Sequence, residues 1–341
     1  MTSAAKFLLL TAVFGLLAAC RKEPQTNQGH SISGSTMGTY FRVTLSEFPN
    51  GIPEDTLQTT LQARLDRIDA RMSTYKPDSE VSRFNRSDST DWFPVSTEAA
   101  TVVIAALEVF EASNGAFDIT VGPLVELWGF GPQESTNQLP APAEIQELLA
   151  TLGSHQLHAR LDPPALKKDH AELRIDLSAI AKGYAVDSLA ASLEELGIPD
   201  YLVDIGGEMR AGGQKADHTP WKIAIETPTA KQRGIQATLP LHDMAIATSG
   251  DYRNYFERDG QRYSHEIDPR TGQPIRHSLV SVSILDTSCM QADAWATALI
   301  VLGPEEGRAL AEQAELPAFL IIREGSDFRQ IETSAFIPHL P

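Results

Sequence analysis

Two short segments of this chain carry polar side chains in a spacing that could bind a charged ligand. In the first, Asp176 precedes a predicted helix that begins near Ile180, and Lys182 lies one turn inside it. A helix N-terminus presents unpaired N–H groups and partial positive charge, so these side chains could bracket a ligand that carries phosphate or a polar ring. The structural alternative is a capping aspartate beside an exposed lysine.

The second segment places Asp293 and Thr297 four residues apart, and therefore on one face of a predicted helix. Both side chains offer oxygen, and Mg2+ prefers oxygen ligands, usually one or two protein carboxylates completed by water and substrate phosphates. The structural alternative is an aspartate that caps a helix and a threonine that bonds back to a carbonyl. Taken singly, each segment leaves both explanations open.

The elements that must position these residues alternate irregularly along the chain. This irregularity favours an α+β fold over a doubly wound parallel sheet, which would show regular βαβ units. Residues 161–170 form a loose region before the first segment. Short runs rich in β-branched and aromatic residues predict strands at 39–45, 201–205, 221–225, 244–248 and 279–284. Apolar residues at helical spacing predict helices at 53–68, 96–113, 143–152, 180–196, 292–302 and 304–314.

The N-terminus has the pattern of a secretory leader. Lys6 precedes an apolar run at 7–17, which ends in Leu-Ala-Ala followed by Cys20. The run is short for a membrane span, and a cysteine in this position is typical of a bacterial lipoprotein. We therefore expect a signal peptide at 1–19, lipidation of Cys20, a flexible tether at 20–33 and one folded domain at 34–341. The domain would be anchored to a bacterial membrane by lipid and face the periplasm.

Composition bounds the classes of ligand. The chain has 341 residues, of which 42% are hydrophobic, and this is enough for a substantial core. Its formal net charge of -17 disfavours nucleic acid as a partner and repels phosphates, so a nucleotide site would need a metal ion or local positive charge. With Cys20 assigned to the lipid, Cys289 has no disulfide partner. We expect it to be a small buried thiol, the alternative being a nucleophile.

Many segments of the chain, in order, resemble the ApbE family of FAD:protein FMN transferases from Gly34 to Leu302. The resemblance implies that family's α+β architecture, an ApbE-like fold with tunnelling-fold-like β-α-β pieces and FAD in a cleft between them. The matching segments are 34–39, 72–75, 79–85, 115–124, 176–187, 204–208, 249–252, 265–272 and 293–297.

The resemblance also implies a set of site residues. An isoalloxazine ring needs flat apolar contact and a few orienting polar groups, and the residue types carried over supply both. The FAD-binding residues would be Met37, Tyr75, Ala116, Phe117, Asp118, Asp176, Lys182 and Ile267. The Mg2+ ligands would be the Ala179 carbonyl, Asp293 and Thr297.

The reaction that the family implies is attack by a threonine hydroxyl of an acceptor protein on the FMN-side phosphorus of FAD, with release of AMP. His265 could take the hydroxyl proton, or it could be a structural histidine bonded to Asp268. Gly206 and Gly207 could allow close approach of the backbone to a ligand or simply form a turn. The implied acceptors are exported subunits of respiratory flavoprotein complexes. Two other functions remain open: an Mg2+-dependent FAD pyrophosphatase that yields FMN and AMP, and a non-catalytic, lipid-anchored flavin-binding protein.

Overall fold

The structure, a computed structural model, describes residues 30–131, 139–229, 234–252 and 254–341. The predicted signal peptide and Cys20 lie outside these residues. The first strand begins at His30, so residues 30–33, which we predicted as the end of the tether, belong to the folded domain instead. Within the described residues, no helix combines the length and the apolar character needed to cross a membrane.

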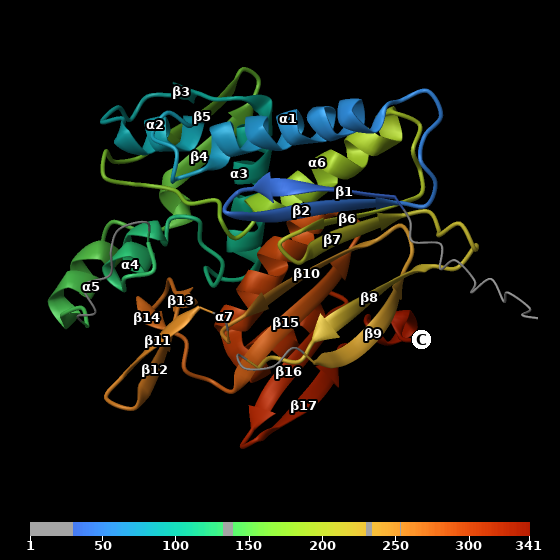
Figure 1. Cartoon of the computed structure of the whole chain (residues 1–341). Helices are drawn as coiled ribbons and strands as arrows, with labels where there is room; N and C mark the ends of the chain where they lie inside the picture. The colour runs from blue at the N-terminus through green and yellow to red at the C-terminus, as the bar shows by residue number, and fades with distance from the viewer. Residues whose placement is uncertain (1–29, 132–138, 230–233, 253) are drawn as a thin grey trace, which may run out of the picture.

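An eight-stranded sheet forms the centre of the molecule (Figure 1), and every pair of neighbouring strands in it is antiparallel. Its strand order is β1-β2-β6-β7-β10-β15-β16-β17. An antiparallel sheet with helices on one face is an α+β arrangement, as predicted. The strands are β1 (His30–Thr36), β2 (Thr39–Leu45), β6 (Tyr201–Ile205), β7 (Glu208–Gly212), β10 (Ala245–Gly250), β15 (Leu279–Asp286), β16 (Ala318–Glu324) and β17 (Asp327–Glu332).

The two faces of this sheet are covered differently. One face packs against α1 (Glu54–Met72), α6 (Ala181–Glu195) and α7 (Cys289–Gln313), and α3 (Thr97–Ala112) packs against α1 and α7; the shared apolar side chains form the main core. The other face is covered by the hairpin of β8 (Trp221–Glu226) and β9 (Ile235–Leu241). Strand β15 is buried from Leu279 to Leu285 because it lies between both layers.

The helices form where the sequence pattern indicates them. Helix α1 buries Leu57, Leu61, Leu65, Ile68 and Met72, which follow one another at intervals of three or four residues and so share one face. Its predicted end at 68 was one turn short.

Helix α7 unites two helices that we predicted separately. It begins at Cys289, where the Ser288 hydroxyl caps it by accepting from the Gln291 N–H. At Gly303 the backbone has φ 83°, a left-handed conformation that glycine accommodates, and Pro304 starts the second part. Strands β15 and β16, which precede and follow α7 in the sequence, are antiparallel neighbours in the sheet.

Smaller elements complete one end of the molecule. They are α2 (Glu80–Arg86), α4 (Gly122–Leu127), α5 (Pro142–Leu149), a sheet of β3 (Phe93–Pro94), β5 (Pro164–Lys168) and β4 (Leu157–Leu161), and two short ladders, β11 (Tyr255–Arg258) with β12 (Gln261–Ser264) and β13 (Ile267–Asp268) with β14 (Gln273–Pro274). The region at 161–170, predicted to be loose, therefore contains strand β5. Three of its five residues, Ala165, Leu166 and Lys168, are buried.

Candidate active site

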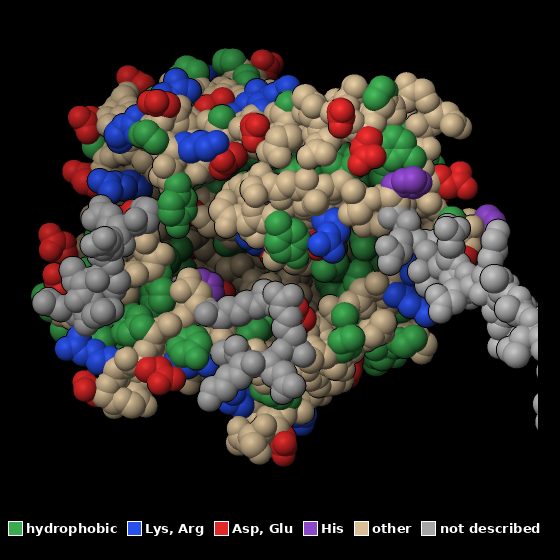
Figure 2. All heavy atoms as spheres, viewed as in Figure 1, with side chains coloured by type: hydrophobic (Ala, Val, Ile, Leu, Met, Phe, Trp, Pro, Cys, Tyr) green, Lys and Arg blue, Asp and Glu red, His purple; other side chains and the backbone are tan. Residues whose placement is uncertain are grey.

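A cavity of about 740 Å³ opens between this smaller end and the main sheet. The space-filling view shows the face hollowed between the helices and β1–β2 above it and the β11–β14 ladders below (Figure 2). Such a volume suits a large organic ligand. Ten predicted site residues and His265 line this one cavity: Tyr75, Ala116, Phe117, Asp118, Asp176, Ala179, Lys182, Ile267, Asp293 and Thr297. Met37 does not line it; this residue lies in the β1–β2 turn and packs against the main core.

On the side of the cavity formed by α6 and α7, a side chain of one helix caps the other. The Gly183 N–H belongs to the first turn of α6, whose N–H groups have no partner within the helix, and it donates to Asp293 Oδ2 at 2.9 Å. Ala179 lies just before α6, and it lines the same cavity as Asp293. Asp293 thus does cap a helix, as one alternative held, yet it caps α6 rather than its own helix.

Charges are concentrated at the same place. Lys182 Nζ lies 2.5 Å from Glu208 Oε1 and 3.9 Å from Asp293 Oδ1. Burial acts to lower the pKa of Lys182, but the Asp293 and Glu208 carboxylates outweigh it and the net shift is upward, so the ammonium stays charged. Burial raises the pKa of Asp293 to about 6, with Lys182 opposing the shift and Glu208 adding to it. Lys182 is paired, and the exposed lysine of the structural alternative does not hold.

These groups fit a magnesium ion, and we call them the metal corner: Ala179, Lys182, Glu208, Asp293 and Thr297. Thr297 Oγ1 lies 3.1 Å from Ser249 Oγ, so the threonine hydroxyl points to strand β10 rather than back to its own helix. Glu208 Oε2 is buried and has no hydrogen-bond partner among the described residues. A cation here would relieve the repulsion between buried carboxylates. The described residues contain no group of three or more His, Cys, Asp and Glu side chains placed to hold a metal, so substrate phosphates would have to complete the shell.

His265 lies between β12 and β13 and lines the same cavity. Its Nδ1 lies 3.1 Å from the Asn254 carbonyl oxygen, which can only accept, so a neutral ring carries its proton on Nδ1. Nε2 then keeps its lone pair, and Glu266 Oε1 lies 3.5 Å from it. Asp268 instead forms two hydrogen bonds with the Arg270 guanidinium, so the alternative of a histidine held by Asp268 is wrong.

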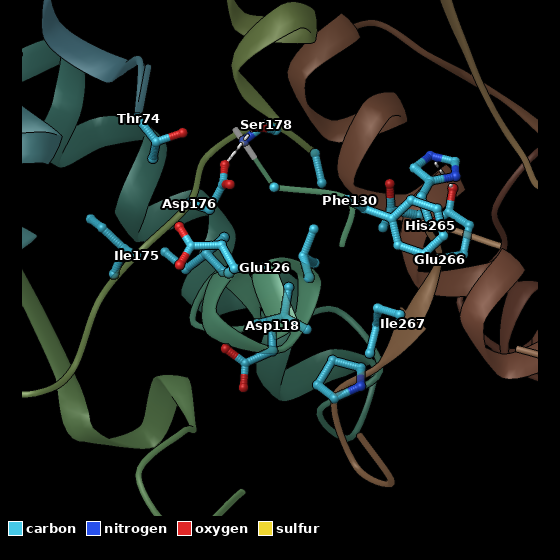
Figure 3. Close-up of a pocket in the computed structure, with 18 of the residues that line it drawn as sticks. Thr74, Asp118, Glu126, Phe130, Ile175, Asp176, Ser178, His265, Glu266 and Ile267 are labelled. Atoms are coloured by element: carbon cyan, nitrogen blue, oxygen red, sulfur yellow. Dashed lines mark hydrogen bonds and ion pairs between the residues drawn. The ribbon is translucent and has the colours of Figure 1, made fainter. Parts of the chain in front are cut away.

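We call this group, Phe130, His265 and Glu266, the histidine end. Figure 3 shows these three side chains together, with Thr74, Ile175 and Asp176 on the opposite side of the cavity. The Phe130 and His265 rings meet edge to face, with centroids 6.3 Å apart. Burial raises the pKa of Glu266, with the neighbouring His265 opposing the shift.

The two predicted polar contacts for a flavin ring also shape the backbone. Asp118 Oδ1 accepts from the Thr120 N–H and from the hydroxyls of Thr120 and Ser154. Asp176 Oδ1 accepts from the Ser178 N–H and hydroxyl, which fixes the turn before α6 (Figure 3). Each carboxylate therefore holds a loop at the cavity wall. Only the lone pairs that these hydrogen bonds leave unused can accept a hydrogen bond from a ligand.

Several lining residues had no clear signal in the sequence. Arg86 and Arg174 bring positive charge to the cavity, which a phosphate ligand requires in so acidic a chain. Glu208 and Glu266 lie within the matching segments 204–208 and 265–272, but they were not predicted as site residues. Phe130 follows helix α4 in a stretch without any recognisable pattern.

Three other residues have structural roles. Gly206 and Gly207 have φ of 65° and 113° in the β6–β7 turn and do not line the cavity, so the turn explains them. Cys289 is a buried free thiol, and burial raises its pKa well above the ordinary value, which suits a packed side chain and not a nucleophile.

Comparison with known proteins gives consistent matches over nearly the whole chain. The FAD:protein FMN transferase of Vibrio cholerae serotype O1 is 46% identical over 334 residues, 98% of each chain. The protein of the same name in Escherichia coli K12 is 40% identical and covers 94% of this chain and 93% of its own.

Solved structures agree in fold. The flavin transferase ApbE from Vibrio cholerae superposes with a TM-score of 0.84 at 45% identity, covering 91% of this chain and 99% of that one. The flavinyl transferase ApbE of Pseudomonas stutzeri in its apo form also gives 0.84, at 41% identity over 92% and 96%. The ApbE family is matched by residues 37–320, a range that holds the cavity, its metal corner and its histidine end. The chain belongs to the ApbE family.

Proposed function

We propose that this enzyme transfers FMN from FAD to a threonine hydroxyl of an acceptor protein, with release of AMP and with dependence on Mg2+. Its relatives at 40–46% identity are named FAD:protein FMN transferases. The observation that carries the proposal for this chain is that one cavity contains both a buried carboxylate, Asp293, which caps the start of α6, and a histidine whose Nε2 is free to accept a proton.

In the reaction, the threonine oxygen attacks the FMN-side phosphorus and a new phosphoester bond forms. The bond from this phosphorus to the AMP oxygen breaks, and AMP leaves with the electron pair. His265 Nε2 accepts the hydroxyl proton, while Nδ1–H remains bonded to the Asn254 carbonyl. The nearby Glu266 carboxylate stabilises the resulting imidazolium when it is ionised.

The metal corner serves the phosphates. Ala179, Asp293 and Thr297 would hold the Mg2+, which supplies Lewis-acid stabilisation of the charge that shifts to the leaving phosphate. Lys182, kept charged by its carboxylate partners, faces the same cavity and adds positive charge there. Tyr75 and Phe117 both line the cavity and would offer ring contact to the flavin. The Tyr75 ring is 67% exposed, whereas Phe117 is buried.

The decisive experiment incubates the purified protein with FAD, Mg2+ and a candidate acceptor. We expect release of AMP and an increase in acceptor mass equal to that of FMN, both lost with EDTA. AMP without a modified acceptor would instead indicate the FAD pyrophosphatase. Retention of FAD without AMP would indicate the flavin-binding protein.

We also propose that the enzyme is a lipoprotein that acts on the periplasmic side of a bacterial membrane, on exported subunits of respiratory flavoprotein complexes. The support is the leader pattern that ends at Cys20. Cys20→Ser should abolish acylation because only the thiol receives the lipid, and the protein should move to the soluble fraction with its transferase activity intact. Mass spectrometry of the N-terminal peptide tests this, and acylation of the serine variant would refute it.

A further inference from the structure

We infer that Asp187, which does not line the cavity, is a positioning residue that sets the register of α7 against α6 and thereby assembles the metal corner. This inference rests on the proposed role of Ala179, Asp293 and Thr297 toward Mg2+. It concerns a side chain that makes no contact with that corner.

The Asp187 carboxylate ties three elements together. Its Oδ1 accepts from the Cys289 N–H at 2.9 Å, and its Oδ2 accepts from the Met290 N–H at 3.0 Å and from the Ser288 hydroxyl at 2.8 Å. A carboxylate of α6 therefore caps the first turn of α7, whose N–H groups have no partner within their own helix. Arg210 on β7 donates to the same Oδ1 at 2.8 Å and holds the carboxylate in place.

One turn away, the two helices touch again. The Gly183 N–H bonds to Asp293 Oδ2, and a methyl group on Gly183 would overlap the Cys289 carbonyl and come within 2.8 Å of Asp293 Cβ. Only glycine permits this approach. The two contacts are four residues apart on α6, from 187 back to 183, and four residues apart on α7, from 289 forward to 293.

Counting four more residues along the sequence in each direction leads to the metal corner. Four residues back from Gly183 is Ala179, and four residues forward from Asp293 is Thr297; both line the cavity. The antiparallel helices thus meet at two levels, the Asp187 cap and the Gly183 crossing, about 6 Å apart along each axis. Beyond the second level, the residue before α6 that carries the proposed carbonyl ligand and the turn of α7 that carries the proposed hydroxyl ligand line the same cavity.

This arrangement predicts what the loss of the cap would do. Without it, α7 can slide or rotate against α6, and the Ala179 carbonyl and Thr297 hydroxyl would leave their common geometry. The effect should fall on metal affinity, because supporting groups of this kind typically change metal affinity or activity by about 10–100-fold. The walls that hold the flavin on the far side of the cavity should keep their shape.

The test compares Asp187→Asn with Asp286→Asn. Asp187→Asn keeps the shape of the side chain but places an amide NH2 group, a donor, where a carboxylate oxygen accepted hydrogen bonds. Asp286 is a matched control because its Oδ1 also supports the start of α7, through the Ser288 N–H at 2.8 Å, but it lies on β15 and bonds to neighbours in its own turn rather than to α6. We would measure the Mg2+ concentration for half-maximal transfer, Mn2+ binding by loss of its free-ion EPR signal with FAD bound, FAD affinity without metal, and melting temperature.

We expect Asp187→Asn to weaken Mg2+ and Mn2+ binding about tenfold or more while FAD affinity is retained, and Asp286→Asn to leave the metal values near wild type. Equal metal affinities in the two variants, or a parallel loss of metal and FAD affinity, would overturn the inference. If Asp187→Asn does not fold, Ser288→Ala removes one of the same ties and should weaken Mn2+ binding more than Asp286→Asn does. Absence of transfer in the wild type would refute the proposed function alone, since Mn2+ binding is measured without turnover.

Discussion

The metal corner and the histidine end face the same cavity but are built from different kinds of structure. The metal corner lies where two long helices cross, and Asp293 and Glu208 are only 4% exposed. The histidine end is formed by the link between the short strands β12 and β13 and by Phe130 after α4, and the His265 side chain is 35% exposed. Its contacts are a loop carbonyl, a neighbouring carboxylate and one aromatic ring.

Under the proposed function, this difference would serve two tasks. Charge on the phosphates must be met by groups that do not reorganise, and such groups are best held by packed helices. The protein acceptor, in contrast, must reach the base from outside, so the base has to lie on a more open wall. A site of this type can keep its electrostatics fixed while the acceptor side admits a large and variable partner.

The strongest test of the comparison is Asp293→Ala. Loss of the one buried carboxylate proposed as a metal ligand should reduce Mg2+-dependent transfer about 10³-fold or more, because charge stabilisation by a metal contributes several kcal/mol. The rate should be followed by acceptor flavinylation at saturating FAD across a series of Mg2+ concentrations. Wild-type activity at limiting Mg2+ would show that the metal assignment is wrong.

The structure adds a stability effect to this variant. Alanine leaves the Gly183 N–H without its acceptor, which should lower the free energy of unfolding by about 1–3 kcal/mol. Asp293→Asn is the matched control, since its amide oxygen can still accept from Gly183 while the charge is gone. It should keep the stability and lose the activity. Thr297→Ala should be milder than either in its effect on rate.

The second test is His265→Ala at the histidine end. General-base assistance is typically worth about a hundredfold or more in rate and little in ground-state affinity, so transfer should fall far more than FAD binding. The pH profile of the transfer rate should also lose its acidic limb. Because the wall is open, the melting temperature should change little.

A scaffold role for His265 predicts a different result. FAD affinity and rate would then fall together, and the acidic limb would remain in the residual activity. Phe130→Ala is a useful companion, since it removes the ring beside the imidazole without removing a proton acceptor. It should reduce the rate less than His265→Ala and keep the pH dependence.

The parts of this molecule that the sequence predicted well are those that depend on local pattern. Helices α1, α3, α5 and α6 were located within four residues at each end because their buried residues repeat at helical spacing and caps mark several ends. Strand β2 was predicted with its full bounds. Strand β17 was missed because it is a polar edge strand, and β16 because its continuous apolar run has no alternation.

The site required more than local pattern. Lys182 and Asp293 lie far apart in the sequence, and no spacing rule connects them; only the resemblance to a family placed both in one site. What the resemblance did not supply was the reason for their geometry. The bond from the Gly183 N–H to Asp293, the Glu208 partner of Lys182 and the Nδ1 bond of His265 depend on tertiary contacts that appear only in the folded chain.

The smallest expected effect concerns stability at the kink in the middle of α7. The His277 ring packs beneath Gly303, where a Cβ atom would come within 2.7 Å of it. Burial lowers the pKa of His277, so the unfolded chain binds this proton more readily than the folded protein. The contribution to stability is therefore complete above the unfolded pKa of about 6.5 and is lost as the pH falls from there toward the lowered folded value.

The substitution His277→Gln removes this titrating group. The melting temperature of the variant should therefore decline less between pH 7.5 and pH 5 than that of the wild type, by about 2 °C. His242→Gln is the control, because that side chain is 66% exposed and should follow the wild-type curve. If His277→Gln followed the wild-type curve as well, burial of the imidazole at the Gly303 kink would not contribute to the acid sensitivity of the fold.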